Sequence, residues 1–126
     1  ILYCLKPMVY KKDAKIAFKK NRLIKNNYNC LKIPKKSVII DCLFGIGLSR
    51  KVKGMYKNII KKVNKSKQYV ISIDIPSGIN GDNGKIMGEA IKANSTYTLH
   101  AKKIGLTINS GMKYSGKVSI IDIGIK

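Results

Sequence analysis

Two aspartates occupy equivalent places in the sequence, each directly after a short apolar segment. Asp41 ends the run VIID and Asp74 ends the run ISID, in a chain that holds six acidic residues. Each is followed within a few residues by a glycine-containing loop. A carboxylate in such a place can take up and return a proton. The alternative is that both carboxylates cap their loops, although structural acids more often lie on helix surfaces beside lysines.

The loop after Asp74 carries a second kind of polar group. It reads PSGINGDNG (76–84), in which the proline stiffens the strand exit and the glycines permit unusual backbone angles. The hydroxyl of Ser77 and neighbouring carbonyl oxygens can ligate a hard cation, which prefers oxygen. A nucleophilic Ser77 is disfavoured, because Ile75 stands where a nucleophile elbow has glycine. Asp82 lies among turn dipeptides, which favours a role in the turn.

The loop after Asp41 begins Gly45-Ile46-Gly47 and continues to Lys51. Glycines after a strand let backbone N–H groups approach a phosphate, and Arg50 or Lys51 can neutralise its charge. The alternative is an ordinary turn, and the spacing alone leaves both interpretations open. A dinucleotide fingerprint needs a third glycine where Arg50 stands, so the sequence disfavours a nicotinamide-dependent dehydrogenase.

The periodicity of apolar residues predicts the elements that must position these groups. Alternating or continuous apolar runs predict strands at residues 1–5, 37–43, 69–75, 95–100 and 117–125. Helical periodicity predicts helices at 11–28, which includes Ile24, and at 56–63, a helical turn at 89–94 and a short helix within 101–116.

Strands that alternate with amphipathic helices indicate an α/β fold with a largely parallel sheet. The run SVIIDCL (37–43) is apolar at consecutive positions, which predicts a strand covered on both faces. Ligands of such sheets bind beyond the carboxyl ends of the strands. Asp41 and Asp74 are therefore expected at that edge of the sheet.

The composition is that of one globular domain. The chain has 126 residues, of which 44% are hydrophobic. It has neither an uncharged apolar run long enough to span a membrane nor the charge order of a signal peptide, so we expect no membrane association. Cys4, Cys30 and Cys42 lack metal-binding spacing, which favours reduced thiols and a cytoplasmic location.

The formal net charge of +20 raises the question of an anionic partner. Of the 26 basic residues, the two arginines are Arg22 and Arg50, and the others are lysines spread along the whole chain. Sites that read bases or clamp phosphates favour arginine, because its planar guanidinium makes paired hydrogen bonds. We therefore interpret the charge as a solvated basic surface and do not expect a nucleic-acid partner.

Three segments together resemble a known family. DCLFGIGLSR (41–50), DIPSGINGDNG (74–84) and GKVSIIDIGI (116–125) are similar to segments of the NAD(P)H-hydrate epimerase family, also called the YjeF N-terminal domain. The resemblance runs from about Ser37 to the end of the chain. It implies a three-layer α/β/α Rossmann-like sandwich and an isomerase that interconverts the R and S forms of hydrated NADH and NADPH in metabolite repair.

The resemblance also implies roles for individual residues. Asp41 and Ser77 match potassium ligands of the family, and Asp74 matches a contact to the hydrated nicotinamide and is our candidate acid/base. Lys103 matches a lysine of the family pattern without an assigned role. The predicted contacts to the nucleotide are Gly45, Ile46, Gly47, Leu48, Ser49, Arg50, Lys51 and Asp74.

One feature of the family pattern is missing. The family has an earlier strand that ends in a GNNGGDG loop, which residues 1–36 do not resemble, and the chain begins with Ile1 rather than methionine. We therefore interpret residues 1–126 as a partial epimerase domain whose activity in isolation is reduced. The family further implies a homodimer and a possible fused ADP-dependent dehydratase domain. The alternative function is a non-catalytic binding module of the same fold, whose basic surface docks a protein or RNA.

Overall fold

The computed structural model of the chain describes residues 2–3, 16, 19–20, 24–25 and 31–125. The chain divides into two compact units, residues 1–32 and 33–126. None of the helices in the described ranges combines the length and the apolar character that crossing a bilayer requires.

The first unit contains two short parallel strands, β1 (Leu2–Tyr3) and β2 (Ile24–Lys25). The backbone is helical at residues 16, 19 and 20, inside the helix predicted for 11–28. That prediction was wrong for Ile24, because Ile24 pairs with Leu2 in the strand ladder. The apolar spacing placed Ile24 on the helix face, but a partner strand outside the local window determined its conformation. The rest of the predicted helix and of the strand at 1–5 lies outside the described residues.

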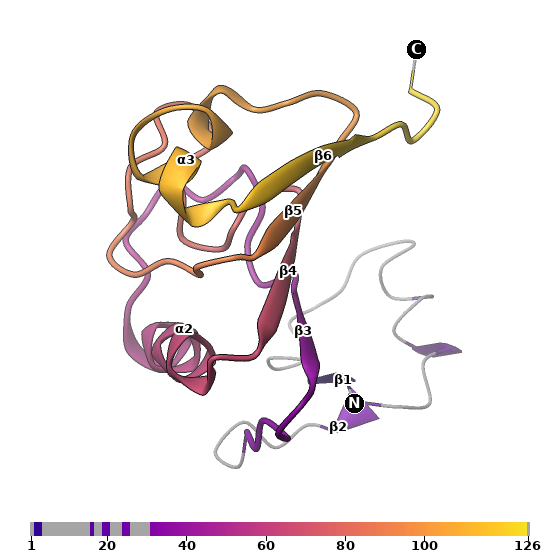
Figure 1. Cartoon of the computed structure of the whole chain (residues 1–126), viewed down its shortest axis with the longest axis vertical. Coiled ribbons are helices and arrows are strands. Elements are labelled where there is room, and N and C mark those ends of the chain that lie inside the picture. Colours follow the sequence, from indigo (N-terminus) through magenta and orange to yellow (C-terminus); the bar gives the residue numbers. More distant parts are fainter. Residues whose placement is uncertain (1, 4–15, 17–18, 21–23, 26–30, 126) are drawn as a thin grey trace. The chain divides into compact units, whose positions relative to one another are not determined.

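The second unit is built on a four-stranded parallel sheet (Figure 1). Its strands follow one another in space in chain order: β3 (Val38–Asp41), β4 (Tyr69–Ile73), β5 (Ser95–Leu99) and β6 (Lys117–Ile121). Parallel neighbours require crossover connections, which here carry the helices. The predicted α/β class and parallel sheet are confirmed.

Helix α2 (Gly54–Ser66) packs on one face of this sheet and forms the first part of the core. Ile60 and Val63 are buried against Val70 of β4. Tyr56 and Ile59 pack against the same cluster, as the predicted i, i+3, i+4, i+7 spacing requires. The helix ends at Ser66, and the next residue, Lys67, adopts a left-handed backbone conformation (φ 55°).

The second part of the core lies under the loop that follows β4. Ile75, Ile79, Ala90 and Leu106 are each at most 2% exposed and form one cluster. The region predicted to hold a short helix contains the 3₁₀ turn η2 (Ile104–Leu106) and helix α3 (Asn109–Tyr114). Figure 1 shows α2 and α3 on the same side of the sheet.

The helical turn predicted at 89–94 was wrong, because this segment is irregular. Its backbone N–H groups donate to other elements rather than to the preceding turn. Ile91 N donates to Ser77 O at 2.9 Å and Asn94 N donates to Val70 O at 2.8 Å. Ala90 and Ile91 are both buried, and each packs into a different one of the two core clusters. Their apolar side chains are therefore buried without a helix.

The two faces of the sheet differ in burial. Because paired residues of parallel strands share a face, Ile39, Val70 and Thr96 face α2 and the core, while the intervening residues face the other way. On that second face Val38 is 57% exposed and Tyr69 is 49% exposed. The prediction that the strand at 37–43 is covered on both faces was therefore wrong for the described part of the chain. An apolar run shows that both faces can be buried, but not that both are.

Candidate functional site

The site begins with a buried carboxylate at the carboxyl end of β3. Asp41 is 3% exposed, and both of its oxygens accept hydrogen bonds. Oδ2 accepts from Ser72 Oγ and from Ser77 N, each at 2.8 Å. Oδ1 accepts from Ser77 Oγ at 2.6 Å and from Leu43 N at 3.3 Å. Such a set of donors compensates for the burial of a carboxylate. Because the donors include Ser72 of β4 and Ser77 of the following loop, this one side chain also connects the exits of β3 and β4.

Ser77 connects this carboxylate to the loop after β3. Its hydroxyl accepts a hydrogen bond from Phe44 N at 2.9 Å and lies 3.3 Å from Phe44 O. The carboxylate, the hydroxyl and this carbonyl place three kinds of oxygen donor next to one another. The structure thus places Asp41 and Ser77 in direct contact, and their role as potassium ligands stays a prediction.

This donor set suits a hard cation. Hard cations prefer oxygen ligands such as carboxylates, hydroxyls and backbone carbonyls. Within the described ranges, no group of three or more His, Cys, Asp or Glu side chains gathers as a transition metal would require. The residues that could hold an ion are Asp41, Ser77 and, through its carbonyl oxygen, Phe44.

Asp74 lies one residue beyond β4 in a conformation that few residues adopt. Its φ is +70°, in the left-handed region where aspartate and asparagine are tolerated better than most other residues. Its backbone N–H donates to Tyr97 O at 2.7 Å, so the exit of β4 is fixed against β5. A non-glycine residue held in this region marks a place where the surrounding structure dictates the backbone, as is common at functional sites.

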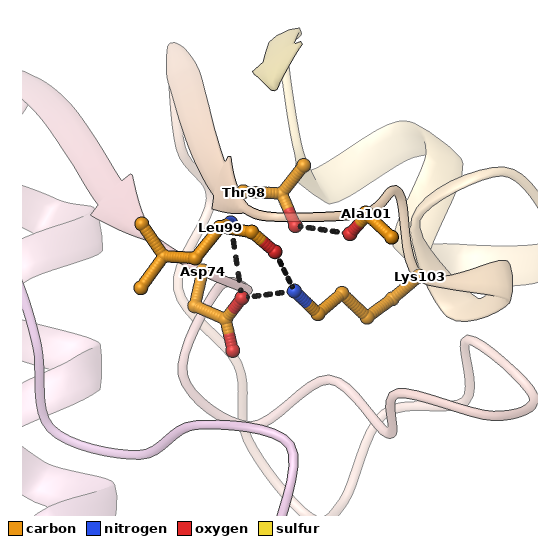
Figure 2. A network of polar contacts seen from close by, with 5 residues as sticks. All are labelled: Asp74, Thr98, Leu99, Ala101 and Lys103. Carbon is orange, nitrogen blue, oxygen red and sulfur yellow. Dashed lines mark hydrogen bonds and ion pairs between the residues drawn. The ribbon is translucent and has the colours of Figure 1, made fainter. Parts of the chain in front are cut away.

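The side chain of Asp74 forms an ion pair with Lys103 (Figure 2). Oδ1 lies 2.5 Å from Lys103 Nζ and accepts a longer hydrogen bond from Leu99 N at 3.3 Å. Lys103 Nζ also donates to Leu99 O at 2.7 Å. Both side chains are about one-fifth exposed, so the pair can be reached from solvent.

The glycine loop after β3 lies beside Asp74. A methyl group added to Gly45 would lie 3.9 Å from Asp74 Oδ2, and one added to Gly81 would lie 3.5 Å from Ile46. Leu48 N donates to Gly45 O at 3.3 Å, which makes the start of the loop a turn. The structure therefore brings the predicted nucleotide loop and the predicted acid/base to one place. Of the predicted contact residues in this loop, Leu48 is half-buried, and the exposed ones are Gly45, Ile46, Gly47, Ser49, Arg50 and Lys51.

Asp82 lies in a tight turn, as its dipeptide context predicted. Its backbone N–H and that of Asn83 both donate to Asn80 Oδ1 at 3.0 Å. The residue is exposed at its position in this turn. Of the two acids in the segment 69–84, Asp74 is thus the one that lies in the site.

The thiol of Cys42, next to Asp41, has a shifted pKa. Partial burial of its thiol, followed by the negative charge of Asp41, raises the pKa of Cys42 above its ordinary value. The thiol therefore stays protonated at neutral pH, which makes it a poor nucleophile.

Sequence reasoning missed one residue of the site, Ser72, and gave no role to another, Lys103. Ser72 is fully buried and donates a hydrogen bond to Asp41. The sequence feature that could have identified it is a single hydroxyl on the core face of an otherwise apolar strand. Lys103 was noted as a match to a lysine of the family pattern, but the sequence assigned it no role. Its pairing depends on the return of the chain after β5 to the end of β4.

Comparisons with known proteins show which family the chain belongs to. Residues 7–105 match the model of a family described as YjeF-related protein N-terminus. A protein named NAD(P)H-hydrate epimerase from Oenococcus oeni is 40% identical over 120 residues, which cover 90% of this chain and 55% of that protein. Proteins of the same name from Lentilactobacillus buchneri and Weissella koreensis are 48% identical over 91 residues and 42% identical over 120 residues.

Each match covers most of this chain but about half of the relative. The match covers 72% of this chain and 42% of the Lentilactobacillus buchneri protein, and 83% of this chain and 54% of the Weissella koreensis protein. The chain thus spans about half the length of the curated relatives it matches. Because the family model matches most of the chain, the chain belongs to the family described as YjeF-related protein N-terminus.

Proposed function

We propose that this chain supplies part of a site that epimerises hydrated NADH and NADPH. The observation that carries the proposal is the position of Asp74, whose Oδ2 faces the exposed glycine loop at residue 45 while its other oxygen is held by Lys103. The name NAD(P)H-hydrate epimerase, which the relatives bear, gives the reaction that such a carboxylate would serve.

The chemistry assigned to Asp74 is proton transfer at the C6 hydroxyl of the hydrate. As a carboxylate, Asp74 takes the hydroxyl proton while the C6–N1 bond breaks, its electron pair goes to N1, and an aldehyde forms at C6. Rotation of the aldehyde and reclosure on its other face return the proton and give the opposite epimer. In the alternative route, Asp74 assists loss and return of the hydroxyl itself.

The loop after β3 is proposed to hold the nucleotide. Glycines at 45 and 47 leave room for a phosphate to approach the backbone. Apart from the glycine itself and its two chain neighbours, no residue has an atom within 4 Å of a methyl group built on Gly47. The exposed side chains of Arg50 and Lys51 lie at the end of this loop, where they can neutralise phosphate charge. In this arrangement the phosphates lie over the loop and the hydrated ring lies near Asp74.

We propose potassium as the ion at the Asp41–Ser77 oxygen cluster. When bound, a monovalent cation there would supply positive charge near the nucleotide phosphates. The contribution of the chain is to gather the oxygens: Asp41 is held by two serines, and Ser77 Oγ is held against the turn at Phe44.

Three finer expectations from the family resemblance are likewise proposals. They are a cytoplasmic location, a homodimer and an association with an ADP-dependent dehydratase domain. The homodimer is tested by light scattering of the purified chain, where a monomeric mass at micromolar concentration would contradict it.

The proposed function is tested with chirally resolved NADH hydrate. We expect the chain to convert one epimer into the other, as followed by chiral or reversed-phase chromatography. Asp74→Asn is the test variant, because asparagine also tolerates a positive φ. Asp82→Asn is the matched control, because it makes the same chemical change in an exposed turn.

The expected result is loss of epimerisation in Asp74→Asn and normal epimerisation in Asp82→Asn. A normal rate in Asp74→Asn would show that Asp74 is not the acid/base. No conversion by the wild-type chain would refute the proposed activity for this chain. If that chain nevertheless bound the hydrate, the result would favour the binding-module alternative.

A further inference from the structure

We infer that Lys103 is a positioning residue, which fixes the carboxylate of Asp74 so that Oδ2 alone is presented to substrate. The inference rests on the proposed function, because it concerns the same carboxylate. It assigns a role to a lysine that the sequence left without one. Three observations support it. They are the hydrogen bond that holds the ammonium group, the different surroundings of the two carboxylate oxygens, and the backbone conformation of Asp74.

The ammonium group is anchored independently of Asp74. Lys103 Nζ donates to the backbone oxygen of Leu99 at 2.7 Å, at the end of β5 (Figure 2). The turn that brings Lys103 back to this place is closed by Thr98 Oγ1, which donates to Ala101 O at 3.3 Å. The ammonium group is therefore held by a backbone oxygen as well as by the carboxylate of Asp74.

The two oxygens of Asp74 have different surroundings. Both hydrogen-bond donors, Lys103 Nζ and Leu99 N, lie at Oδ1. Oδ2 points toward the loop, where a methyl group added to Gly45 would lie 3.9 Å away. A carboxylate without the ammonium group could rotate about its Cα–Cβ and Cβ–Cγ bonds, so that neither oxygen would stay directed at the loop. The ion pair with Lys103 restrains these rotations and keeps one acceptor directed at the loop.

The backbone of Asp74 makes this orientation rigid. Its φ of +70° and its N–H bond to Tyr97 O fix the direction in which the side chain leaves the end of β4. With the backbone fixed, one side-chain contact is enough to define where the carboxylate lies. Productive geometry within a fraction of an ångström is what positioned catalytic groups require.

The test compares Lys103→Ala with two controls in the epimerisation assay. Lys103→Arg keeps the charge and the donors, and Lys102→Ala removes a charge from the exposed neighbouring lysine. We expect kcat of Lys103→Ala to fall by about 100-fold, the usual scale for a misplaced catalytic group. KM for the hydrate is expected to stay within about twofold, because the phosphates are held by the loop at 45–51.

Chemical rescue distinguishes positioning from a merely structural role. Ethylammonium, which fits the space left by the lysine side chain and can donate hydrogen bonds, should restore part of kcat in Lys103→Ala with saturation. Tetramethylammonium has the same charge but no N–H donor, and it should restore nothing. Wild-type kcat in Lys103→Ala, equal rescue by both cations, or an equal loss in Lys102→Ala would each overturn the inference.

A second readout does not depend on activity. In ¹⁵N-lysine spectra of the wild-type chain, the Nζ–H resonance of Lys103 is expected to be observable because hydrogen bonding slows its exchange with water. Asp74→Asn should shift or remove this resonance, and Asp82→Asn should leave it unchanged. An unmoved resonance in Asp74→Asn would refute the ion pair. Absence of wild-type epimerisation alongside an intact pair would refute the proposed function instead.

Discussion

Replacing Asp41 with asparagine tests whether the buried carboxylate organises the edge of the sheet. The carboxylate accepts from four donors, whereas an amide has one oxygen and presents N–H groups on its other side. The best orientation of the new amide keeps its oxygen at the position of Oδ2. There it retains the two 2.8 Å bonds from Ser72 Oγ and Ser77 N.

The cost arises at the position of Oδ1, where the amide nitrogen would lie. Ser77 Oγ can turn its hydroxyl and accept a bond from the amide, but Leu43 N–H has no such freedom and loses its acceptor. A backbone donor left without a partner costs about 1–3 kcal/mol. We therefore expect Asp41→Asn to lower the free energy of unfolding by about 1–3 kcal/mol. In a unit of this size, each kcal/mol corresponds to a fall in Tm of about 4–8 °C.

The assay is urea and thermal unfolding followed by circular dichroism, with Asp82→Asn as the control for the same change at an exposed site. The measurements are repeated in potassium chloride and in choline chloride at equal ionic strength. An ion bound at the Asp41–Ser77 oxygens stabilises the folded state, so potassium should raise the Tm of the wild type but not of Asp41→Asn. Equal stability of wild type and Asp41→Asn would refute the hydrogen-bond argument. An equal effect of potassium on both proteins would refute the cation site.

Two further predictions concern packing and the thiol beside the site. Gly111→Ala should lower the free energy of unfolding by at least about 1–3 kcal/mol, because its methyl group would clash with the backbone oxygen of Gly105. Gly47→Ala should change the free energy of unfolding by less than about 0.5 kcal/mol, because its methyl group would meet no atom within 4 Å beyond its chain neighbours. Equal urea midpoints for the two variants would contradict this packing. Because the pKa of Cys42 is raised, its alkylation by iodoacetamide, measured by peptide mass spectrometry, should rise at a higher pH than that of an ordinary cysteine. Asp41→Asn should lower that pH, and an ordinary profile in the wild type would contradict the prediction.

Local periodicity predicted most elements of the second unit. Helix α2 follows from the spacing of Tyr56, Ile59, Ile60 and Val63, which bury one stripe against β4. The strand exits at Asp41 and Asp74 also follow from apolar runs that stop at a polar residue. The prediction of a helical turn at 89–94 was wrong. The backbone of this segment forms hydrogen bonds with residues that are distant in sequence, and a local pattern does not contain those partners.

The residue types and their order are enough to place two carboxylates and a glycine loop at the carboxyl edge of a parallel sheet, because that edge is defined by the direction of the strands. The structure decides how these groups are used. It joins Asp41 to Ser72 and Ser77, over separations of 31 and 36 residues. It also selects one lysine, Lys103, as the partner of Asp74. These contacts arise where the chain returns after each crossover, and a sequence read in local windows does not contain that return.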